Sequence, residues 1–221
     1  MENLKEKKFS NLRQKVAKET ALLLYTEQRK EYKQAKKQAT ETLGARIMPT
    51  NREVADELDK LAEEIEGDAK RERLVQMRKE ALKIMQALEK FKPRLIGSVW
   101  RGTANKNSDI DILLHHSGLD QIIHVLQENA FNITHTKRQT TTKQGIRKTS
   151  FHIYLTLQSD HTAEIVIKDT EKKDASEKCE IYLDEITGLT LENLKQVLEN
   201  YPTQTFIPKR SYIKGMILDK L

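Results

Sequence analysis

The sequence predicts an α+β protein in which an all-helical N-terminal region precedes a mixed-sheet core and a short helical C-terminal extension. Residues 1–92 contain only two glycines and one proline, and they are rich in residues that favour helices. From residue 93 onward, short runs rich in β-branched residues replace this pattern. The expected divisions are a helical region at 1–92, a core at 93–170 and an extension at 171–221 that contains one helix.

Three helices are expected in the N-terminal region. The first spans Ser10–Leu43, the second begins at a capping box of Thr50 and Glu53, and Gly67 ends or bends it. The third spans Asp68–Phe91. Its apolar stripe predicts that this helix docks on the rest of the chain, and the alternative is a dimer through the N-terminal helices. Its apolar stripe consists of Leu74, Met77, Ala81, Ile84, Leu88 and Phe91.

The core is expected to follow the order strand, strand, helix, strand, strand, strand. The predicted strands lie at residues 94–96, 109–114, 131–136, 148–157 and 162–168, and the helix begins after Ser117. Residues 169–178 are highly charged and predict an exposed connection. The last helix is expected at about Leu191–Tyr201, where Pro202 stops it.

Composition and charge narrow the class of protein. The net charge of +6 indicates an anionic partner such as a nucleotide or nucleic acid. The chain lacks a run of about 20 apolar residues, so no membrane span is expected. Cys179 is the only cysteine, which excludes an internal disulfide. A cytoplasmic location is therefore expected.

Two carboxylates occupy alternate positions of the second predicted strand. Asp109 and Asp111 should project from one face of the sheet, while Ile110 and Ile112 project into a core on the other face. Two adjacent carboxylates repel each other, which raises the pKa of one of them unless a cation lies between them. Magnesium prefers oxygen ligands of this kind together with substrate phosphates. The pair therefore predicts a magnesium site.

Small polar residues precede this strand at a fixed distance. Gly97 and Ser98 follow the first predicted strand and are expected at a turn, where glycine lets the backbone approach a phosphate closely. Ser108, directly before Asp109, offers a further hydroxyl. These residues are candidates for contacts with a nucleotide.

The segment from Gly97-Ser98-Val99-Trp100-Arg101-Gly102 through Ser108-Asp109-Ile110-Asp111 resembles the signature of the DNA polymerase beta nucleotidyltransferase superfamily. The closest variant is the minimal nucleotidyltransferase type. The resemblance covers residues 95–114, and the wider core would extend to about Lys168. It implies a nucleotidyltransferase core, Mg²⁺ with one or two ions, and a nucleoside triphosphate substrate, with ATP expected.

The resemblance also implies roles for individual residues. A third carboxylate from a later strand would join the pair, and Glu164 is the best match, with Asp160 and Asp169 as rivals at strand ends. Family members more often carry aspartate there. Gly97, Ser98, Ser108 and Arg101 would bind the nucleotide, although Arg101 could instead brace its loop through a salt bridge. His115 and His116 are interpreted as strand-end residues, and Trp100 as a base-stacking residue or a loop anchor.

A basic segment without acidic residues lies between the third and fourth predicted strands. Residues 137–148 are expected to form a hairpin loop that binds acceptor phosphates or is simply solvated. Its positive residues are Lys137, Arg138, Lys143, Arg147 and Lys148.

The predicted function is transfer of a nucleoside monophosphate from a triphosphate to a hydroxyl acceptor, with release of pyrophosphate. An RNA 3′ end fits the basic charge, and a protein side chain fits the minimal type, whose relatives include antitoxins. The alternative is a catalytically weak binding or antitoxin-like regulatory protein on the same fold. Repulsion between Asp109 and Asp111 favours the enzyme, because a protein that binds no metal gains nothing from it.

Overall fold

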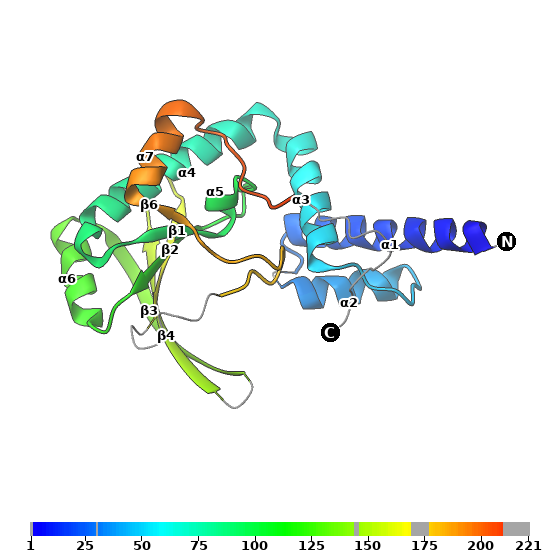
Figure 1. The fold of residues 1–221 in the computed structure, drawn as a ribbon, viewed down its shortest axis with the longest axis horizontal. Helices are drawn as coiled ribbons and strands as arrows, with labels where there is room; N and C mark the ends of the chain where they lie inside the picture. Colours follow the sequence, from blue (N-terminus) through cyan, green and yellow to red (C-terminus); the bar gives the residue numbers. More distant parts are fainter. Residues whose placement is uncertain (1, 30, 144–145, 169–176, 210–221) are drawn as a thin grey trace.

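The computed structural model describes residues 2–29, 31–143, 146–168 and 177–209. A layer of helices covers one side of a β-sheet, and the first helices project away from it at one end of the molecule (Figure 1). The long β3–β4 hairpin extends beyond the ends of the other strands (Figure 1). The predicted α+β class with a mixed sheet is confirmed.

The N-terminal region contains four helices, not the three predicted. They are α1 (Glu2–Tyr25), α2 (Tyr32–Thr42), α3 (Asn51–Glu66) and α4 (Asp68–Ala87), followed by the 3₁₀ turn η1 (Glu89–Phe91). The single first helix expected at 10–43 is therefore wrong. It breaks at Glu27, whose φ of 56° is left-handed, and α2 folds back onto α1. Val16, Leu23, Ala35 and Ala39 form a small core between these two helices.

Helix α3 begins and ends at the predicted residues. The Thr50 side chain accepts a hydrogen bond from the Glu53 backbone amide, and the Glu53 side chain accepts one from the Thr50 amide, which completes the capping box. Gly67 ends α3 with a left-handed φ of 54°, and α4 begins directly after it. This glycine turns the chain from the helical projection back toward the sheet.

The sheet has six strands in the order β3-β4-β5-β2-β1-β6. Its strands are β1 (Arg94–Ile96), β2 (Ile110–His115), β3 (Asn132–Lys143), β4 (Ile146–Thr156), β5 (Thr162–Lys168) and β6 (Leu189–Thr190). Only the β2–β5 pair is parallel. The predicted strands are present, and β6 is an additional two-residue strand.

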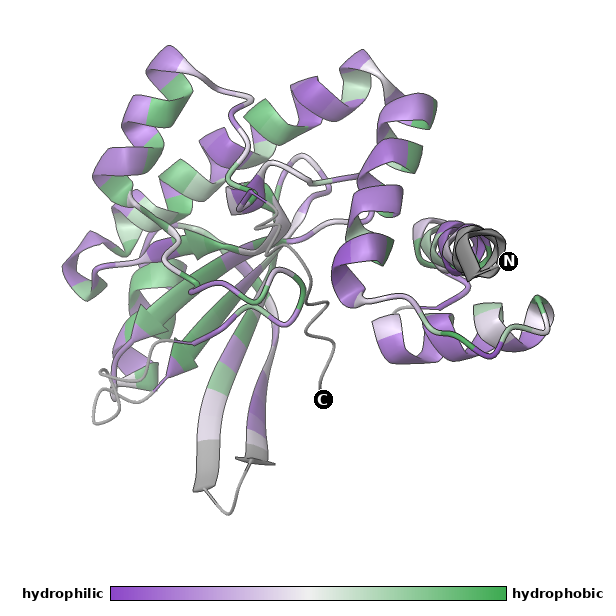
Figure 2. Ribbon diagram, turned by 45° about the vertical axis from the view of Figure 1, so that its right-hand side comes forward, coloured by the Kyte–Doolittle hydropathy of each residue, from purple (hydrophilic) through white to green (hydrophobic). Residues whose placement is uncertain are grey.

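Helices pack on one face of this sheet. These are α4, α6 (Leu119–Glu128) and α7 (Leu191–Asn200). Apolar residues of these helices and of the sheet form the main core. Figure 2 colours the ribbon green at the hydrophobic residues of these elements. The entire predicted stripe of α4 and η1 is buried in this core. The stripe therefore docks on its own chain, and a dimer seam through it is wrong.

Two local predictions are also wrong. Residues 137–148 do not form a loop, because β3 extends to Lys143 and β4 starts at Ile146, and residues 144–145 lie outside the described structure. Gly97 does not lead into a turn but begins the short helix α5 (Gly97–Arg101). Among the described residues, no helix is long and apolar enough to cross a membrane.

Candidate functional site

Strand pairing brings the predicted carboxylates together on the sheet face opposite the main core. In the parallel β2–β5 pair, Asp111 lies directly opposite Glu164. Asp109 immediately precedes β2 and alternates with the buried Ile110. Asp109 is exposed, whereas Asp111 and Glu164 are half-buried. Three carboxylates therefore gather around the start of two central strands.

The pKa of Asp111 is strongly raised within this cluster. Burial, together with the charges of Glu164 and Asp109, raises the pKa of Asp111 from an ordinary 3.8 to about 7. Burial is the largest cause, because a desolvated carboxylate favours its neutral form. A cation between these carboxylates would counter both causes.

Gly97 packs directly against Asp111. Its φ of 70° is left-handed, and a Cβ added at this position would lie 2.0 Å from the Asp111 Oδ2 atom. Any side chain here would collide with the carboxylate, so glycine is required both by the backbone conformation and by the available space. The start of α5 is thereby fixed against Asp111.

Glu164 is held by two residues of the neighbouring strand β4. The Nδ1 atom of His152 lies 2.6 Å from Glu164 Oε1, and the His152 Nε2 atom lies 2.8 Å from the hydroxyl of Ser150. Tyr154, opposite Glu164 in the sheet, forms a side-chain hydrogen bond with Glu164, and burial with this bond raises the pKa of Tyr154 to about 12. The Glu164 carboxylate is therefore oriented by a histidine and a tyrosine.

Asp109 and Ser108 each accept a hydrogen bond at the side chain. The Thr162 hydroxyl donates to Asp109 Oδ1. The Ser108 hydroxyl accepts a hydrogen bond of 3.0 Å from the backbone amide of Asn105, so this side chain closes the loop before β2. Ser98, half-buried in the first turn of α5, accepts a backbone hydrogen bond from Thr103 at its carbonyl oxygen.

The donors fit a divalent cation by their chemistry. Three carboxylates supply the oxygen ligands that Mg²⁺ prefers, and their mutual repulsion at Asp111 is relieved by positive charge. In the described part of the chain, however, no three His, Cys, Asp or Glu side chains are already arranged as a ligand set. Glu164 in particular is turned toward His152. Asp109 and Asp111 are therefore the residues most suited to hold a metal.

Arg101 is buried, and its bonds are to residues outside the cluster of Asp109, Asp111 and Glu164. Its guanidinium forms two bonds with Asp184, of 2.7 and 2.8 Å, and donates to the Phe206 carbonyl oxygen. It also lies 3.9 Å from the ring centroid of Trp100 and 5.1 Å from that of Tyr182. The geometry favours the bracing role for Arg101 and the anchoring role for Trp100.

Asp184→Asn tests this brace. The substitution leaves the buried Arg101 cation without its carboxylate partner, and we expect the free energy of unfolding to fall by about 2–4 kcal/mol. Urea unfolding measures this effect, and unchanged stability would contradict the bracing role of Arg101.

The remaining candidates lie outside the cluster. His116 Nδ1 accepts a hydrogen bond from the Gly118 amide and its ring packs edge-on against Phe91, so it supports the strand end. Asp160 is an exposed residue with a left-handed φ of 65° between β4 and β5. Asp169 lies outside the described residues. Of the two candidates that the structure describes, Glu164 is the one that lies opposite Asp111.

Lys137 and Arg138 are exposed on β3, and the Arg138 guanidinium lies 5.6 Å from the Phe151 ring centroid. Lys143, Arg147 and Lys148 belong to the outer part of the hairpin, where only the backbone is described. No acidic residue occurs between Phe131 and Ser159. The projecting hairpin of Figure 1 is therefore free of negative side chains.

His152, Tyr154 and Thr162 were not found from the sequence. His152 and Tyr154 share a strand phase, but their contact with Glu164 depends on the β4–β5 register, which no local pattern reveals. Thr162, two residues before Glu164, has the same phase as that residue, and this is the one signal that could have pointed to it.

Comparisons with known proteins match part of the chain. Residues 78–182 match a family described as a domain of unknown function, DUF4269. No protein of curated function matches the sequence.

Solved structures with similarity include a Cid1 poly(U) polymerase bound to MgATP, at 17% identity and a TM-score of 0.31 over 50% of this chain and 38% of that chain. A cytoplasmic RNA terminal U-transferase is 18% identical, with a TM-score of 0.32 over 51% of this chain and 35% of that chain. The GLD-2/RNP-8 complex is 17% identical, with a TM-score of 0.28, covering 52% of this chain and 45% of that chain. The chain thus spans less than half the length of each of these structures.

Proposed function

We propose that this protein is a metal-dependent nucleotidyltransferase of the DNA polymerase beta type, closest to the minimal form, which transfers a nucleoside monophosphate to a hydroxyl acceptor. One observation carries the proposal: Asp109, Asp111 and Glu164 converge beside a glycine that admits no side chain. Structural carboxylates are normally paired with cations, whereas burial and two neighbouring carboxylates raise the pKa of Asp111. Such a cluster is stabilised by binding positive charge.

Each residue of the site has its own role in the proposed transfer reaction. Gly97 and Ser98 receive the triphosphate, since the backbone can approach closely there. Asp109 and Asp111 would hold Mg²⁺, which would supply positive charge to the triphosphate oxygens. Glu164, oriented by His152 and Tyr154, accepts the proton of the acceptor hydroxyl. The acceptor oxygen forms a bond to the α-phosphorus, and the bond to the pyrophosphate oxygen breaks.

The acceptor is an RNA 3′ end or a protein side chain, and ATP is the expected donor. The acid-free β3–β4 hairpin supports a polyanionic acceptor, because a surface without carboxylates does not repel phosphates. Lys137 lies on the strand phase of His135, which stacks at 4.2 Å on Tyr154 beside Glu164. A lysine and aromatic rings therefore lie between the hairpin and the carboxylates. Single-stranded nucleic acid binds to such surfaces through its phosphates and its stacked bases.

Lys137→Glu tests the hairpin as an acceptor surface. We expect roughly threefold slower transfer to RNA at low salt, and a weaker dependence of transfer on salt concentration, because one phosphate contact is lost. Arg138 points to the other face, against Phe151, and is left unchanged. The matched control is Lys83→Glu on the exposed side of α4, whose helix packs on the opposite face of the sheet. Equal losses in both variants would show that only net charge matters.

Labelled nucleotide transfer tests the proposed function itself. The purified protein is incubated with Mg²⁺, small RNAs, cell protein and each α-labelled nucleoside triphosphate in turn, beside Asp109→Ala/Asp111→Ala. Label transferred by the wild type alone supports the proposal, and nuclease or protease sensitivity of the product identifies the acceptor. Absence of both transfer and nucleotide binding would refute the enzyme and favour the antitoxin-like binding protein.

A further inference from the structure

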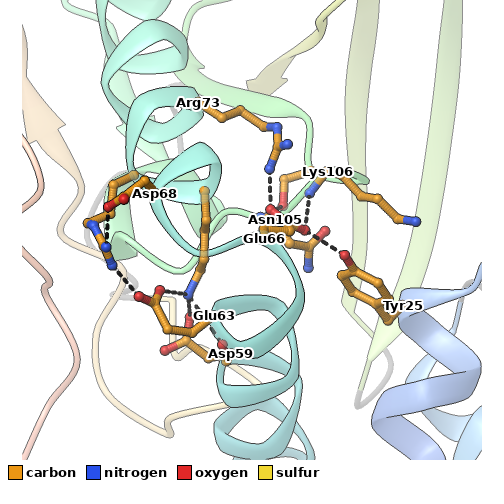
Figure 3. A network of polar contacts seen from close by, with 11 residues as sticks. Tyr25, Asp59, Glu63, Glu66, Asp68, Arg73, Asn105 and Lys106 are labelled. Atoms are coloured by element: carbon orange, nitrogen blue, oxygen red, sulfur yellow. Dashed lines mark hydrogen bonds and ion pairs between the residues drawn. The ribbon is translucent and has the colours of Figure 1, made fainter.

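The loop between α5 and β2 is fastened to the N-terminal helices at two points. Figure 3 shows Tyr25 of α1 and Glu66 of α3 meeting the loop at Asn105 and Lys106. The backbone amide of Lys106 donates to Glu66 Oε1 at 3.1 Å, and the side-chain amide of Asn107 donates to the Tyr25 carbonyl oxygen at 2.7 Å. The loop directly precedes Asp109, so both fastenings lie within three residues of the proposed metal ligand.

Glu66 is the centre of this network. Its Oε1 atom also accepts a hydrogen bond of 3.0 Å from the Tyr25 hydroxyl, and its Oε2 atom pairs with Arg73 of α4. The Glu66 side chain is only 5% exposed. A buried carboxylate that bonds one backbone amide and two side chains has a fixed orientation, and it transmits that orientation to the amide it binds.

The loop is rigid enough to pass this constraint to Asp109. The Asn107 amide donates to the Asn105 side chain at 2.9 Å, and the Asn105 amide donates to the Ser108 hydroxyl at 3.0 Å. Asn105 is itself buried. Residues 105–108 therefore form one hydrogen-bonded unit between the Glu66 contact and the carboxylate.

We propose that Glu66 is a positioning residue for Asp109, so that the N-terminal helical region is an integral part of the active site and not a separate module. This inference rests on the proposed function for its effect on activity. Its physical basis is that a ligand supported by outer hydrogen bonds binds metal more tightly than an unsupported one, because less freedom is lost on binding.

The test compares Glu66→Ala, Glu66→Gln and Glu63→Gln. Glutamine keeps an oxygen that can accept from Tyr25 and Lys106, whereas alanine removes it. Glu63 lies one turn earlier on α3, pairs with Lys70 and Arg71, and has no bond to the loop, so it is the matched control. Asn107→Ala cuts the second fastening without leaving a buried charge, and it keeps the test valid if Glu66→Ala fails to fold.

Two readouts are needed. Glu66→Ala and Asn107→Ala should raise the Mg²⁺ concentration for half-maximal transfer by about 10-fold, Glu66→Gln should recover most of this loss, and Glu63→Gln should match the wild type. Hydrogen exchange at the amides of residues 106–109 should quicken in the same variants. Lower thermal stability with unchanged Mg²⁺ dependence and unchanged exchange would overturn the inference.

The exchange measurement separates this inference from the proposed function. A wild type that transfers no nucleotide would refute the function, while loop exchange would still show whether Glu66 orders the segment before Asp109. Transfer by the wild type with no effect of Glu66→Ala would refute the positioning role alone.

Discussion

Asp111→Asn is expected to lower nucleotide transfer on the order of 1,000-fold and, at the same time, to stabilise the metal-free protein at neutral pH. The loss of transfer follows because the amide cannot supply the negative charge that holds Mg²⁺ at the α-phosphate. The gain in stability follows because the amide needs no ionisation in a desolvated position beside Glu164. Because the charged form of Asp111 destabilises the folded protein, Asp111→Asn should both lose transfer activity and gain stability.

The pH dependence gives this prediction its sign. The pKa of Asp111 is about 7 in the folded protein, against an ordinary 3.8 for an exposed aspartate. Between about pH 4 and pH 7 the folded protein therefore binds a proton that the unfolded chain has released, and its stability falls as the pH rises through this window. We expect Asp111→Asn to remove this fall, with a gain of about 1–3 kcal/mol at pH 8. Urea unfolding at pH 5 and pH 8 without metal measures it.

Asp109→Asn is the matched control. Its substitution should abolish transfer. Because Asp109 is exposed, the substitution should not bring a comparable gain in stability. Addition of Mg²⁺ should stabilise the wild type at pH 8 and leave Asp111→Asn unaffected. If Asp111→Asn were less stable than the wild type at pH 8, Asp111 would be a structural carboxylate and the electrostatic description of the site would be wrong.

Gly97→Ala is expected to lower transfer at least ~100-fold, because its methyl group would occupy the position of the Asp111 carboxylate. The added Cβ atom would lie 2.0 Å from Asp111 Oδ2, and the φ of 70° is itself unfavourable for alanine. Either the carboxylate or the start of α5 must move, and a displacement of about 1 Å at a reacting centre lowers the rate strongly. Steady-state transfer rates measure the effect.

Gly44→Ala separates strain from collision. Gly44 has a similar φ of 56°, but an added Cβ atom would meet nothing within 4 Å. We expect this variant to lose about 1 kcal/mol of stability and to retain full transfer activity. Equal activity in the two variants would mean that close packing of Gly97 on Asp111 has no catalytic importance.

Local patterns predicted much of the fold. The capping box at Thr50, the stripe of α4 and the strand at 162–168 follow from side-chain chemistry and periodicity within a few residues, and the structure has each of them. The break at Glu27 was missed because residues 10–43 contain no glycine or proline. It results from packing of α2 back onto α1, which is a tertiary effect.

In the candidate site, too, local sequence patterns identified some residues, whereas contacts made by tertiary packing were missed. Asp109, Asp111 and Gly97 could be selected because they lie within 15 residues of one another and carry a motif. The contacts of Glu164 with His152 and of Glu66 with Lys106 join residues 12 and 40 positions apart. These contacts depend on strand register and helix docking, for which a single sequence carries no local signal.

Parallel labelling of the α- and γ-phosphates tests the central claim most directly. The acceptor should gain the α-label at the rate at which the γ-label appears in pyrophosphate, only with Mg²⁺, and neither product should form with Asp109→Ala/Asp111→Ala. Release of the γ-label as orthophosphate, or equal rates in the double variant, would contradict nucleotidyl transfer by this carboxylate cluster.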